Sequence, residues 1–318
     1  MKILLIMGAS DGNNFQSVKA GRMLGLGTAL PRQVDLSPAG LDRVEAVVRD
    51  YVDRGEVAGA VTLTARHGRI ANVGVYGMND HLQRRRMRRD TIFRIFSMTK
   101  PVTALAMAIL ADRGMWKPME PISTYLPELA ERDVAFVDSS GRVSRAMARH
   151  QPLMIELLTH TAGFAYGTQT EDPVDRIYQQ AGVLGADGAD DLVTRVAHLP
   201  LAQHPGEGFR YSISTDLQGA IVERLTGQRL DRFMKREIFS PLGMNCTGFY
   251  VPPGYRDRVA QMYRFQSDHL VPTENPLFND WTERPAIAWG GMGLYSTVDD
   301  YAGSPNCYST KAVGMGLV

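Results

Sequence analysis

Residues 93–101 read Phe-Arg-Ile-Phe-Ser-Met-Thr-Lys-Pro, an apolar, strand-like stretch that runs directly into a helical pattern. The apolar side chains that follow recur at helical spacing and predict one buried helix face; they are Val102, Leu105, Ala106, Ile109 and Leu110. Pro101 has no N–H to donate, so it fits only the first turn of such a helix. The pattern therefore predicts that Ser97 lies at or just before a helix N-terminus.

Ser97 and Lys100 together indicate a chemistry. Residues three apart on a helix lie one turn from each other on the same side. The Lys100 amine can accept the serine proton, and the positive end of the helix favours the oxyanion that forms next. This arrangement is typical of acyl transfer through a serine nucleophile. The S-x-x-K pattern alone, however, arises by chance in many chains.

Size and composition indicate a soluble globular protein with one large domain or two interleaved ones. The 318 residues are 44% hydrophobic and 22% charged, and the formal net charge is +1. The charge balance gives no reason to expect nucleic acid or a membrane surface as a partner, and no apolar run approaches the roughly 18 residues of a membrane span. Cys246 and Cys307 are far apart and suggest neither a metal cluster nor a disulfide framework, so we expect a cytoplasmic protein.

Two other patterns invite a functional interpretation. Residues 8–12 read G-x-S-x-G, the nucleophile-elbow pattern, but only seven residues precede it. A plain turn in an irregular leader over residues 1–40 is therefore favoured. Residues 84–89 are a dense basic run before Asp90. Because no aromatic residues interleave with the charges, a solvated loop is favoured over an anion or nucleic-acid site.

Hydrophobic periodicity outlines the remaining elements. A helix is expected over residues 41–54, followed by two strands over 57–66 and 69–76 around a His67-Gly68 turn. A loop or short hairpin is expected around Ser140-Gly141, and irregular strands are expected over residues 246–285. Helices are expected over residues 153–158, 190–199 and 230–239; a further helix ends at Gly227, and another begins with Thr297 as its cap. Residues 165–190 contain several Gly and Asp, and we expect them to form an exposed excursion.

Five segments form an ordered set at sensible separations: residues 93–101, 157–164, 205–212, 238–244 and 290–301. Together they resemble the serine β-lactamase and penicillin-binding-protein superfamily, and most closely its class C β-lactamase-like esterases, the family VIII carboxylesterases. The resemblance implies an α/β (α+β), β-lactamase/transpeptidase-like fold with an all-helical insertion. We expect a mixed α/β sheet domain of residues 41–85 plus 215–318, a helical domain of residues 86–214, and a cleft at their junction with Ser97 at its floor.

The resemblance also implies roles for matched residues. Ser97 would be the acylated nucleophile, and its backbone N–H would form half of the oxyanion hole. Lys100 and Tyr211 would shuttle its proton, and the resemblance leaves open which of them is the base. His160 invites a Ser–His interpretation, but its segment is structural in the family, so no catalytic role is expected for it.

Two departures from the family pattern bear on the substrate and on activity. Class C lactamases carry Asn two residues after the tyrosine, where it contacts the substrate amide; Ile213 stands there in this chain and favours simple esters over lactams. The third family motif, K-T-G, H-x-G or W-G-G, is expected well beyond the G-G-x-G-L-x-S-T segment. Trp289, Gly290 and Gly291 spell W-G-G within that earlier segment and are secondary candidates for oxyanion and substrate contacts. The resemblance stops after Tyr301, so a C-terminally truncated sheet is expected.

These observations predict a serine hydrolase that cleaves short-chain carboxylic esters through an acyl-enzyme on Ser97, with Lys100 and Tyr211 as activating residues and no metal or other cofactor. A β-lactamase, D-amino-acid peptidase or acyltransferase of the same superfamily is the alternative enzyme. A truncated, catalytically impaired homologue is the alternative to an active one. The expected partner is a small-molecule ester, with no nucleic acid and no membrane. An open sheet edge would also favour dimerisation or aggregation.

Overall fold

The computed structural model describes residues 4–7, 27–274 and 282–303. The chain divides into two compact units. Unit 1 comprises Met1–Ile95, Arg236–Glu283 and Tyr295–Val318, and unit 2 comprises Phe96–Lys235 and Arg284–Leu294. The G-x-S-x-G segment and the tail beyond Gly303 lie outside the described residues. No helix in the described ranges is both long enough and apolar enough to cross a membrane.

The sheet of unit 1 contains β1 (Leu4–Met7), β2 (Gly27–Thr28), β3 (Gly59–Arg66), β4 (Arg69–Asp80) and β5 (Arg85–Arg86). Strands β3 and β4 pair antiparallel, which confirms the predicted hairpin. His67 and Gly68 at its turn have φ values of 52° and 68°, the left-handed conformation that a two-residue hairpin turn needs. The strand order is β1-β3-β4-β2, with β1 parallel to β3, β2 parallel to β4, and β5 paired with β4.

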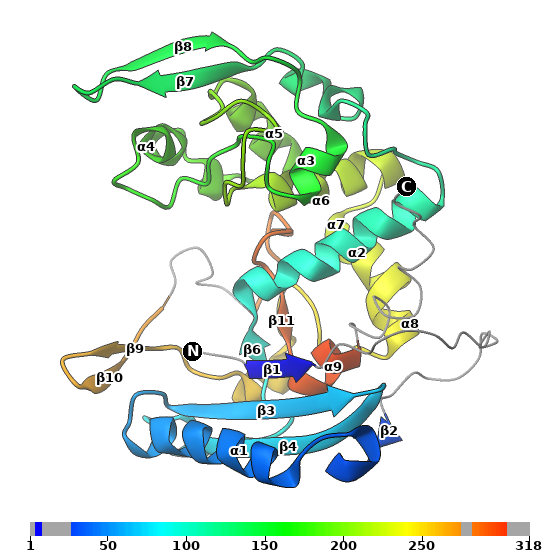
Figure 1. Cartoon of the computed structure of the whole chain (residues 1–318), viewed down its shortest axis with the longest axis vertical. Helices are drawn as coiled ribbons and strands as arrows, with labels where there is room; N and C mark the ends of the chain where they lie inside the picture. The colour runs from blue at the N-terminus through cyan, green and yellow to red at the C-terminus, as the bar shows by residue number, and fades with distance from the viewer. Residues whose placement is uncertain (1–3, 8–26, 275–281, 304–318) are drawn as a thin grey trace. The chain divides into compact units, whose positions relative to one another are not determined.

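Helix α1 (Pro38–Asp53) lies along the hairpin of β3 and β4 (Figure 1) and confirms the helix predicted over residues 41–54. Ser37 caps this helix by accepting the N–H of Gly40 at 3.2 Å. The expectation of an irregular leader over residues 1–40 was wrong in part. Because the edge of β3 offers unpaired backbone groups, the short run of β1 pairs with it in register from Leu4–Thr62 onward.

The remaining elements of unit 1 are short. They are β6 (Phe93–Arg94), paired with β11 (Tyr295–Ser296); β9 (Tyr263–Gln266), paired with β10 (His269–Pro272); α8 (Ser240–Leu242); and α9 (Val298–Gly303). Thr297 caps α9 by accepting the N–H of Asp300 at 3.2 Å, as expected. The basic run is partly neutralised, since Arg85 and Arg89 pair with Asp80 at 2.9 Å and Asp299 at 2.7 Å.

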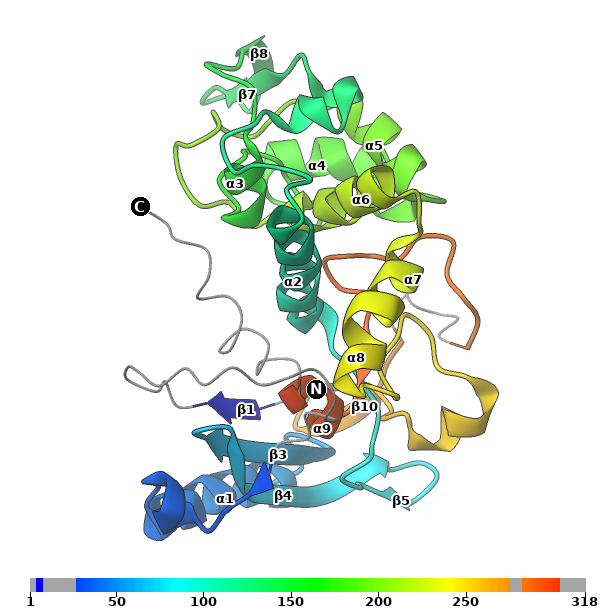
Figure 2. The ribbon, with the colours of Figure 1, turned by 90° about the vertical axis from the view of Figure 1, so that its right-hand side faces the viewer.

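Unit 2 is mainly helical. Its elements are α2 (Thr99–Asp112), the hairpin β7 (Asp133–Val137) and β8 (Val143–Met147), α3 (Met154–Leu158), α4 (Pro173–Gln180), α5 (Ala189–Ala197), α6 (Ser214–Thr226) and α7 (Leu230–Met234). Helix α6 is central, because it packs against α2, α3, α5 and α7 (Figure 2). Its apolar core-facing residues, such as Leu217 and Ile221, are fully buried.

The expectation of an exposed excursion over residues 165–190 was wrong in part, because residues 168–171 are exposed but other parts of the segment are buried. Tyr166 is 6% exposed and Tyr178 is fully buried, and Pro173–Gln180 forms α4. The glycines and aspartates of this segment shape turns and caps, for example at Asp172, whose carboxylate accepts the N–H groups of Val174 and Asp175. Short polar residues therefore indicate turns here without indicating exposure.

The domain bounds remain a prediction. The sequence placed residues 215–318 with the sheet, whereas contacts place α6 and residues 284–294 in unit 2. The physical reason is that α6 buries its apolar face against other helices of unit 2, and residues 290–294 are hydrogen-bonded to α2.

Candidate active site

Ser97 lies in a 3₁₀ turn (Phe96–Met98) immediately before α2, which confirms the prediction that it precedes a helix N-terminus. Its side chain is exposed, whereas Val102, Ala106 and Leu110 on the same helix are fully buried. Phe96 has a φ of 44°, which a side chain with a Cβ adopts only under strain. Backbone strain of this kind is concentrated at functional sites and points to the residue that follows.

Ser97, Lys100 and Tyr211 meet in the structure. The Ser97 Oγ lies 2.5 Å from the Tyr211 hydroxyl oxygen, and the Lys100 Nζ donates to the same Oγ at 3.4 Å. The ammonium also lies 4.6 Å from the centroid of the Tyr211 ring, a cation–π distance. The Ser97 hydroxyl therefore has a phenol and an amine within reach of its proton.

Two further aromatic rings hold Tyr211. His160 stacks on it, with ring centroids 5.2 Å apart and planes 16° apart, and Tyr166 meets it edge-on at 5.5 Å. Burial, helped by the Lys100 ammonium, lowers the pKa of His160 to about 4, so the ring is neutral near pH 7. His160 thus supports Tyr211 as a flat, uncharged surface. Sequence reasoning missed Tyr166, because no periodic signal marks its irregular segment as buried.

The glycine segment is fixed to α2 by three neighbouring side chains. The Lys100 Nζ donates to the Gly291 carbonyl at 2.7 Å, and the Thr103 hydroxyl donates to the Gly290 carbonyl at 2.7 Å. Thr99 accepts the N–H of Leu294 at 3.1 Å. A Cβ on Gly290 would lie 2.6 Å from the Thr215 carbonyl oxygen, closer than real side chains come. Glycine at position 290 therefore allows this close approach.

The other predicted site residues do not contact the Ser97 hydroxyl in the way that Lys100 and Tyr211 do. Ile213 is fully buried at the start of α6, and Trp289 is 8% exposed. The Gly291 N–H donates to Asp216 at 2.7 Å, so Gly291 reaches the site through its carbonyl. We therefore propose neither a substrate contact for Ile213 nor an oxyanion role for Gly291. No group of three or more His, Cys, Asp or Glu that could hold a metal ion occurs in the described parts of the chain.

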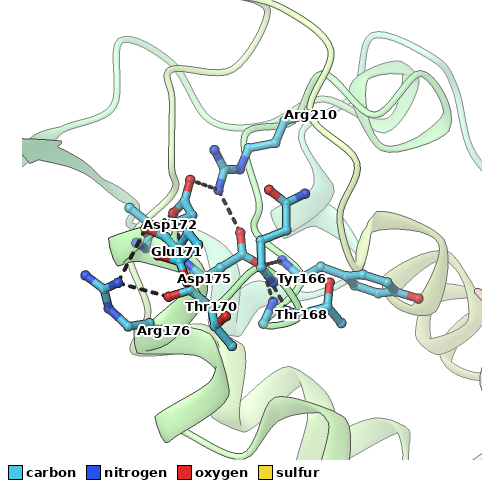
Figure 3. Close-up of polar contacts among 11 residues, drawn as sticks. Tyr166, Thr168, Thr170, Glu171, Asp172, Asp175, Arg176 and Arg210 are labelled. Atoms are coloured by element: carbon cyan, nitrogen blue, oxygen red, sulfur yellow. Dashed lines mark hydrogen bonds and ion pairs between the residues drawn. The ribbon is translucent and has the colours of Figure 1, made fainter. Parts of the chain in front are cut away.

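A buried carboxylate supports this region from the side of α4. Asp175 is 2% exposed, and one of its oxygens accepts the backbone N–H groups of Gly167 at 2.6 Å and Thr168 at 3.1 Å (Figure 3). Its other oxygen accepts from Arg210 at 2.8 Å, and Arg210 precedes Tyr211 directly. Asp175 therefore ties the loop that follows Tyr166 to the segment that carries Tyr211.

Comparison with known proteins identifies the family. The model of the beta-lactamase family matches residues 44–303. The chain belongs to the beta-lactamase family. The predicted resemblance and the β-lactamase/transpeptidase-like α/β fold are both confirmed.

Relatives of this beta-lactamase family member include an esterase. The chain is 36% identical over 262 residues to an uncharacterized protein of Mycobacterium tuberculosis, covering 82% of this chain and 64% of that protein. It is 33% identical over 285 residues to the esterase EstB of Burkholderia gladioli, covering 81% of this chain and 67% of EstB. The chain thus spans about 64% of the length of the mycobacterial relative.

Solved structures show the same fold. The hydrolase EstCE1, described as having promiscuous acyltransferase activity, aligns with a TM-score of 0.69 and 25% identity over 85% of this chain and 73% of its own. A mutant of the simvastatin synthase LovD from Aspergillus terreus aligns with a TM-score of 0.71 and 25% identity over 87% and 68%. This chain thus shares its fold with a hydrolase that has promiscuous acyltransferase activity and with a simvastatin synthase.

The free energy of unfolding of this beta-lactamase family member should depend on pH in a way that reveals whether His160 is neutral in the folded state. The folded-state pKa of about 4 lies below the ordinary 6.5, so the stability contributed by neutral His160 is complete above pH 6.5 and is lost as the pH falls towards 4. We expect the difference in unfolding free energy between the wild type and His160→Gln to shrink over that window by on the order of 1 kcal/mol, a value reduced for partial exposure.

Urea unfolding of both proteins at several pH values measures this difference. Asp216 titrates in the same range, because burial raises its pKa to about 6, but both proteins keep it and its effect cancels. A constant difference between pH 7 and 4 would contradict a buried, neutral His160.

Proposed function

We propose that this chain is a serine esterase that cleaves short-chain carboxylic esters through an acyl-enzyme on Ser97. The observation that carries the proposal is the contact of the Ser97 Oγ with the Tyr211 oxygen at 2.5 Å and with the Lys100 Nζ at 3.4 Å. The 33% identity with the esterase EstB supports an ester substrate.

In the proposed reaction, the Ser97 Oγ attacks the ester carbonyl and its proton passes to the nearer group, the Tyr211 oxygen, which takes part as the phenolate and becomes a neutral phenol. Lys100 balances the charge of this proton shuttle. The N-terminal end of α2 and the Ser97 backbone N–H stabilise the tetrahedral oxyanion. The intermediate collapses, the C–O bond to the alcohol breaks, and the alkoxide takes the proton from Tyr211. Water then attacks the acyl-Ser97 carbonyl and gives one proton to the Tyr211 phenolate. The bond between the acyl carbon and the Ser97 Oγ breaks, the acid leaves, and the Oγ takes that proton back from Tyr211.

Tyr211 is suited to this shuttle because its ring is held on two sides. His160 stacks on one face and Tyr166 contacts it edge-on, so the hydroxyl has little freedom to leave Ser97. A proton acceptor that is already in place needs no reorganisation in the transition state, which is where preorganised sites gain their rate.

The position two residues after Tyr211 argues for esters over lactams. Ile213 offers no amide, and its side chain is fully buried. A lactam substrate would therefore lack one hydrogen bond there, and a hydrogen bond worth about 1.4 kcal/mol changes the rate about tenfold. We expect kcat/KM for p-nitrophenyl butyrate to exceed that for a chromogenic cephalosporin by at least about tenfold, measured under the same conditions. Faster hydrolysis of the cephalosporin would overturn the ester preference.

A second candidate is acyl transfer to an alcohol instead of water. It is supported by the acyltransferase names among the relatives, such as the acyltransferase mokF of Monascus pilosus at 27% identity, and by the description of EstCE1. Adding a primary alcohol to the butyrate assay distinguishes the two, since an acyltransferase forms the butyrate ester of the added alcohol whereas a strict hydrolase forms only the acid. Absence of any acyl-enzyme would instead support a catalytically impaired homologue.

A further inference from the structure

Asp216 is a buried carboxylate that the proposed reaction does not use. It lies in the first turn of α6, five residues after Tyr211, and is 3% exposed. One oxygen, Oδ1, accepts the Gly291 N–H at 2.7 Å. The other oxygen, Oδ2, is buried and has no hydrogen-bond partner among the residues that the structure describes. A buried carboxylate with an unsatisfied oxygen is expensive, so its charge calls for an explanation.

Gly291 connects this carboxylate to the proposed active site. The residue donates its N–H to Asp216 and accepts from the Lys100 Nζ on its carbonyl at 2.7 Å. The carboxylate also covers the face of the glycine, because a Cβ added there would lie 2.6 Å from Oδ2 and 3.0 Å from Oδ1. Asp216 therefore fixes the position of the Gly291 carbonyl, which accepts a hydrogen bond from the Lys100 ammonium.

A structural role alone does not explain the charge. The oxygen of an asparagine amide would accept the Gly291 N–H without burying an anion, and the neighbouring carbonyl of Gly290 is already held by Thr103. What asparagine could not supply is a negative charge that interacts with the Lys100 ammonium. Lys100 is the cation whose field acts on this carboxylate and favours its ionised form against the effect of burial.

We propose that Asp216 is a positioning residue for Lys100: it fixes the Gly291 carbonyl, and its charge keeps the ammonium beside the Ser97 Oγ. This inference rests on the proposed acyl-enzyme on Ser97. Asp216 touches no reacting atom, and it acts through Gly291 and the electrostatic field.

The test uses the pH dependence of kcat/KM for p-nitrophenyl butyrate. Because burial raises the pKa of Asp216 to about 6, ionised Asp216 is lost below that pH, and activity of the wild type should fall as the pH decreases through 6. The titratable groups around it are Lys100, Tyr211, Tyr166 and His160. Burial lowers the pKa of His160 to about 4 and raises that of Tyr166, so neither ring changes its protonation near pH 6.

We expect Asp216→Asn to reduce kcat at least about tenfold at pH 8 with little change in KM, and to lose the decrease near pH 6. The matched control is Asp300→Asn in unit 1, which removes a half-buried carboxylate that also accepts a backbone N–H, from Cys246 at 2.7 Å. This control should keep the wild-type kcat and pH profile. An Asp216→Asn protein with wild-type kcat and an unchanged profile would overturn the proposal.

A second pair of variants covers the case in which Asp216→Asn folds poorly. Gly291→Ala places a methyl group against the carboxylate and should lower the unfolding midpoint, and Asp216→Ala in the same chain removes that clash and should restore it. We expect the double variant to regain the unfolding midpoint but not the wild-type kcat. A double variant with wild-type kcat would overturn the proposal. Ser97→Ala separates the two levels: activity that survives it contradicts the acyl-enzyme itself, whereas a full kcat in Asp216→Asn contradicts only the role of Asp216.

Discussion

Replacing Ser97 with alanine is expected to abolish turnover of p-nitrophenyl butyrate, with kcat falling by at least about 10⁴-fold. The physical reason is that no covalent acyl-enzyme forms without the Oγ, which lies 2.5 Å from the Tyr211 oxygen and 3.4 Å from the Lys100 Nζ. Steady-state assays measure the loss. Mass spectrometry after treatment with an alkyl fluorophosphonate shows whether an adduct forms on the peptide that contains residue 97.

The matched control is Ser144→Ala, which removes an exposed hydroxyl on β8 that makes one long hydrogen bond, to the Phe136 carbonyl at 3.4 Å. This variant should keep the wild-type kcat and the adduct on Ser97. Turnover that persists in Ser97→Ala, together with an adduct at another residue, would show that the nucleophile is assigned to the wrong side chain.

Replacing Asp175 with alanine is expected to lower the free energy of unfolding by about 3–5 kcal/mol. The carboxylate is 2% exposed and accepts from Gly167, Thr168 and Arg210 (Figure 3). Its loss leaves buried backbone N–H groups without their acceptor and leaves the half-buried Arg210 guanidinium with Asp172 as its remaining carboxylate partner. Urea unfolding followed by circular dichroism measures the change. Asp175→Asn should lose less, because the amide oxygen can still accept from the loop.

Asp138→Ala is the control for this second prediction. Asp138 also accepts two backbone N–H groups, from Ser140 at 2.8 Å and Arg142 at 3.0 Å, but it does so on an exposed turn between β7 and β8. Water can replace these hydrogen bonds, so we expect a loss below about 1 kcal/mol. Equal losses at positions 138 and 175 would contradict the view that burial makes Asp175 important.

Local features of the site could be predicted from the sequence. Ser97 lies in the 3₁₀ turn that leads into α2, and Lys100 lies three residues later in the first turn of α2, which Pro101 marks. Their proximity therefore follows from local helical geometry. Tyr211 is more than a hundred residues from Ser97, and no periodicity connects them. Its place beside Ser97 was predicted only because ordered motifs resemble a family with that arrangement.

Contacts that depend on packing were missed or misinterpreted. The segment around Tyr166 is rich in Gly and Asp, which usually indicates an exposed loop, but the Asp175 carboxylate pairs its backbone N–H groups and allows it to be buried. Residues 289–291 spell W-G-G, yet the Gly291 N–H donates to Asp216. Short polar residues and glycines indicate which turns the backbone can form locally. They do not indicate which distant residue the backbone will contact in the folded chain.

The sequence by itself determined the helical turn that joins Ser97 to Lys100 and, through ordered motifs, the beta-lactamase family. Both depend on neighbours along the chain, for which helix geometry and turn chemistry suffice. Only the tertiary structure decided what surrounds that turn: His160 and Tyr166 around Tyr211, and Asp216 behind the glycine that holds Lys100. These contacts join distant segments, and they exist because burying α6 among the other helices brings those segments together.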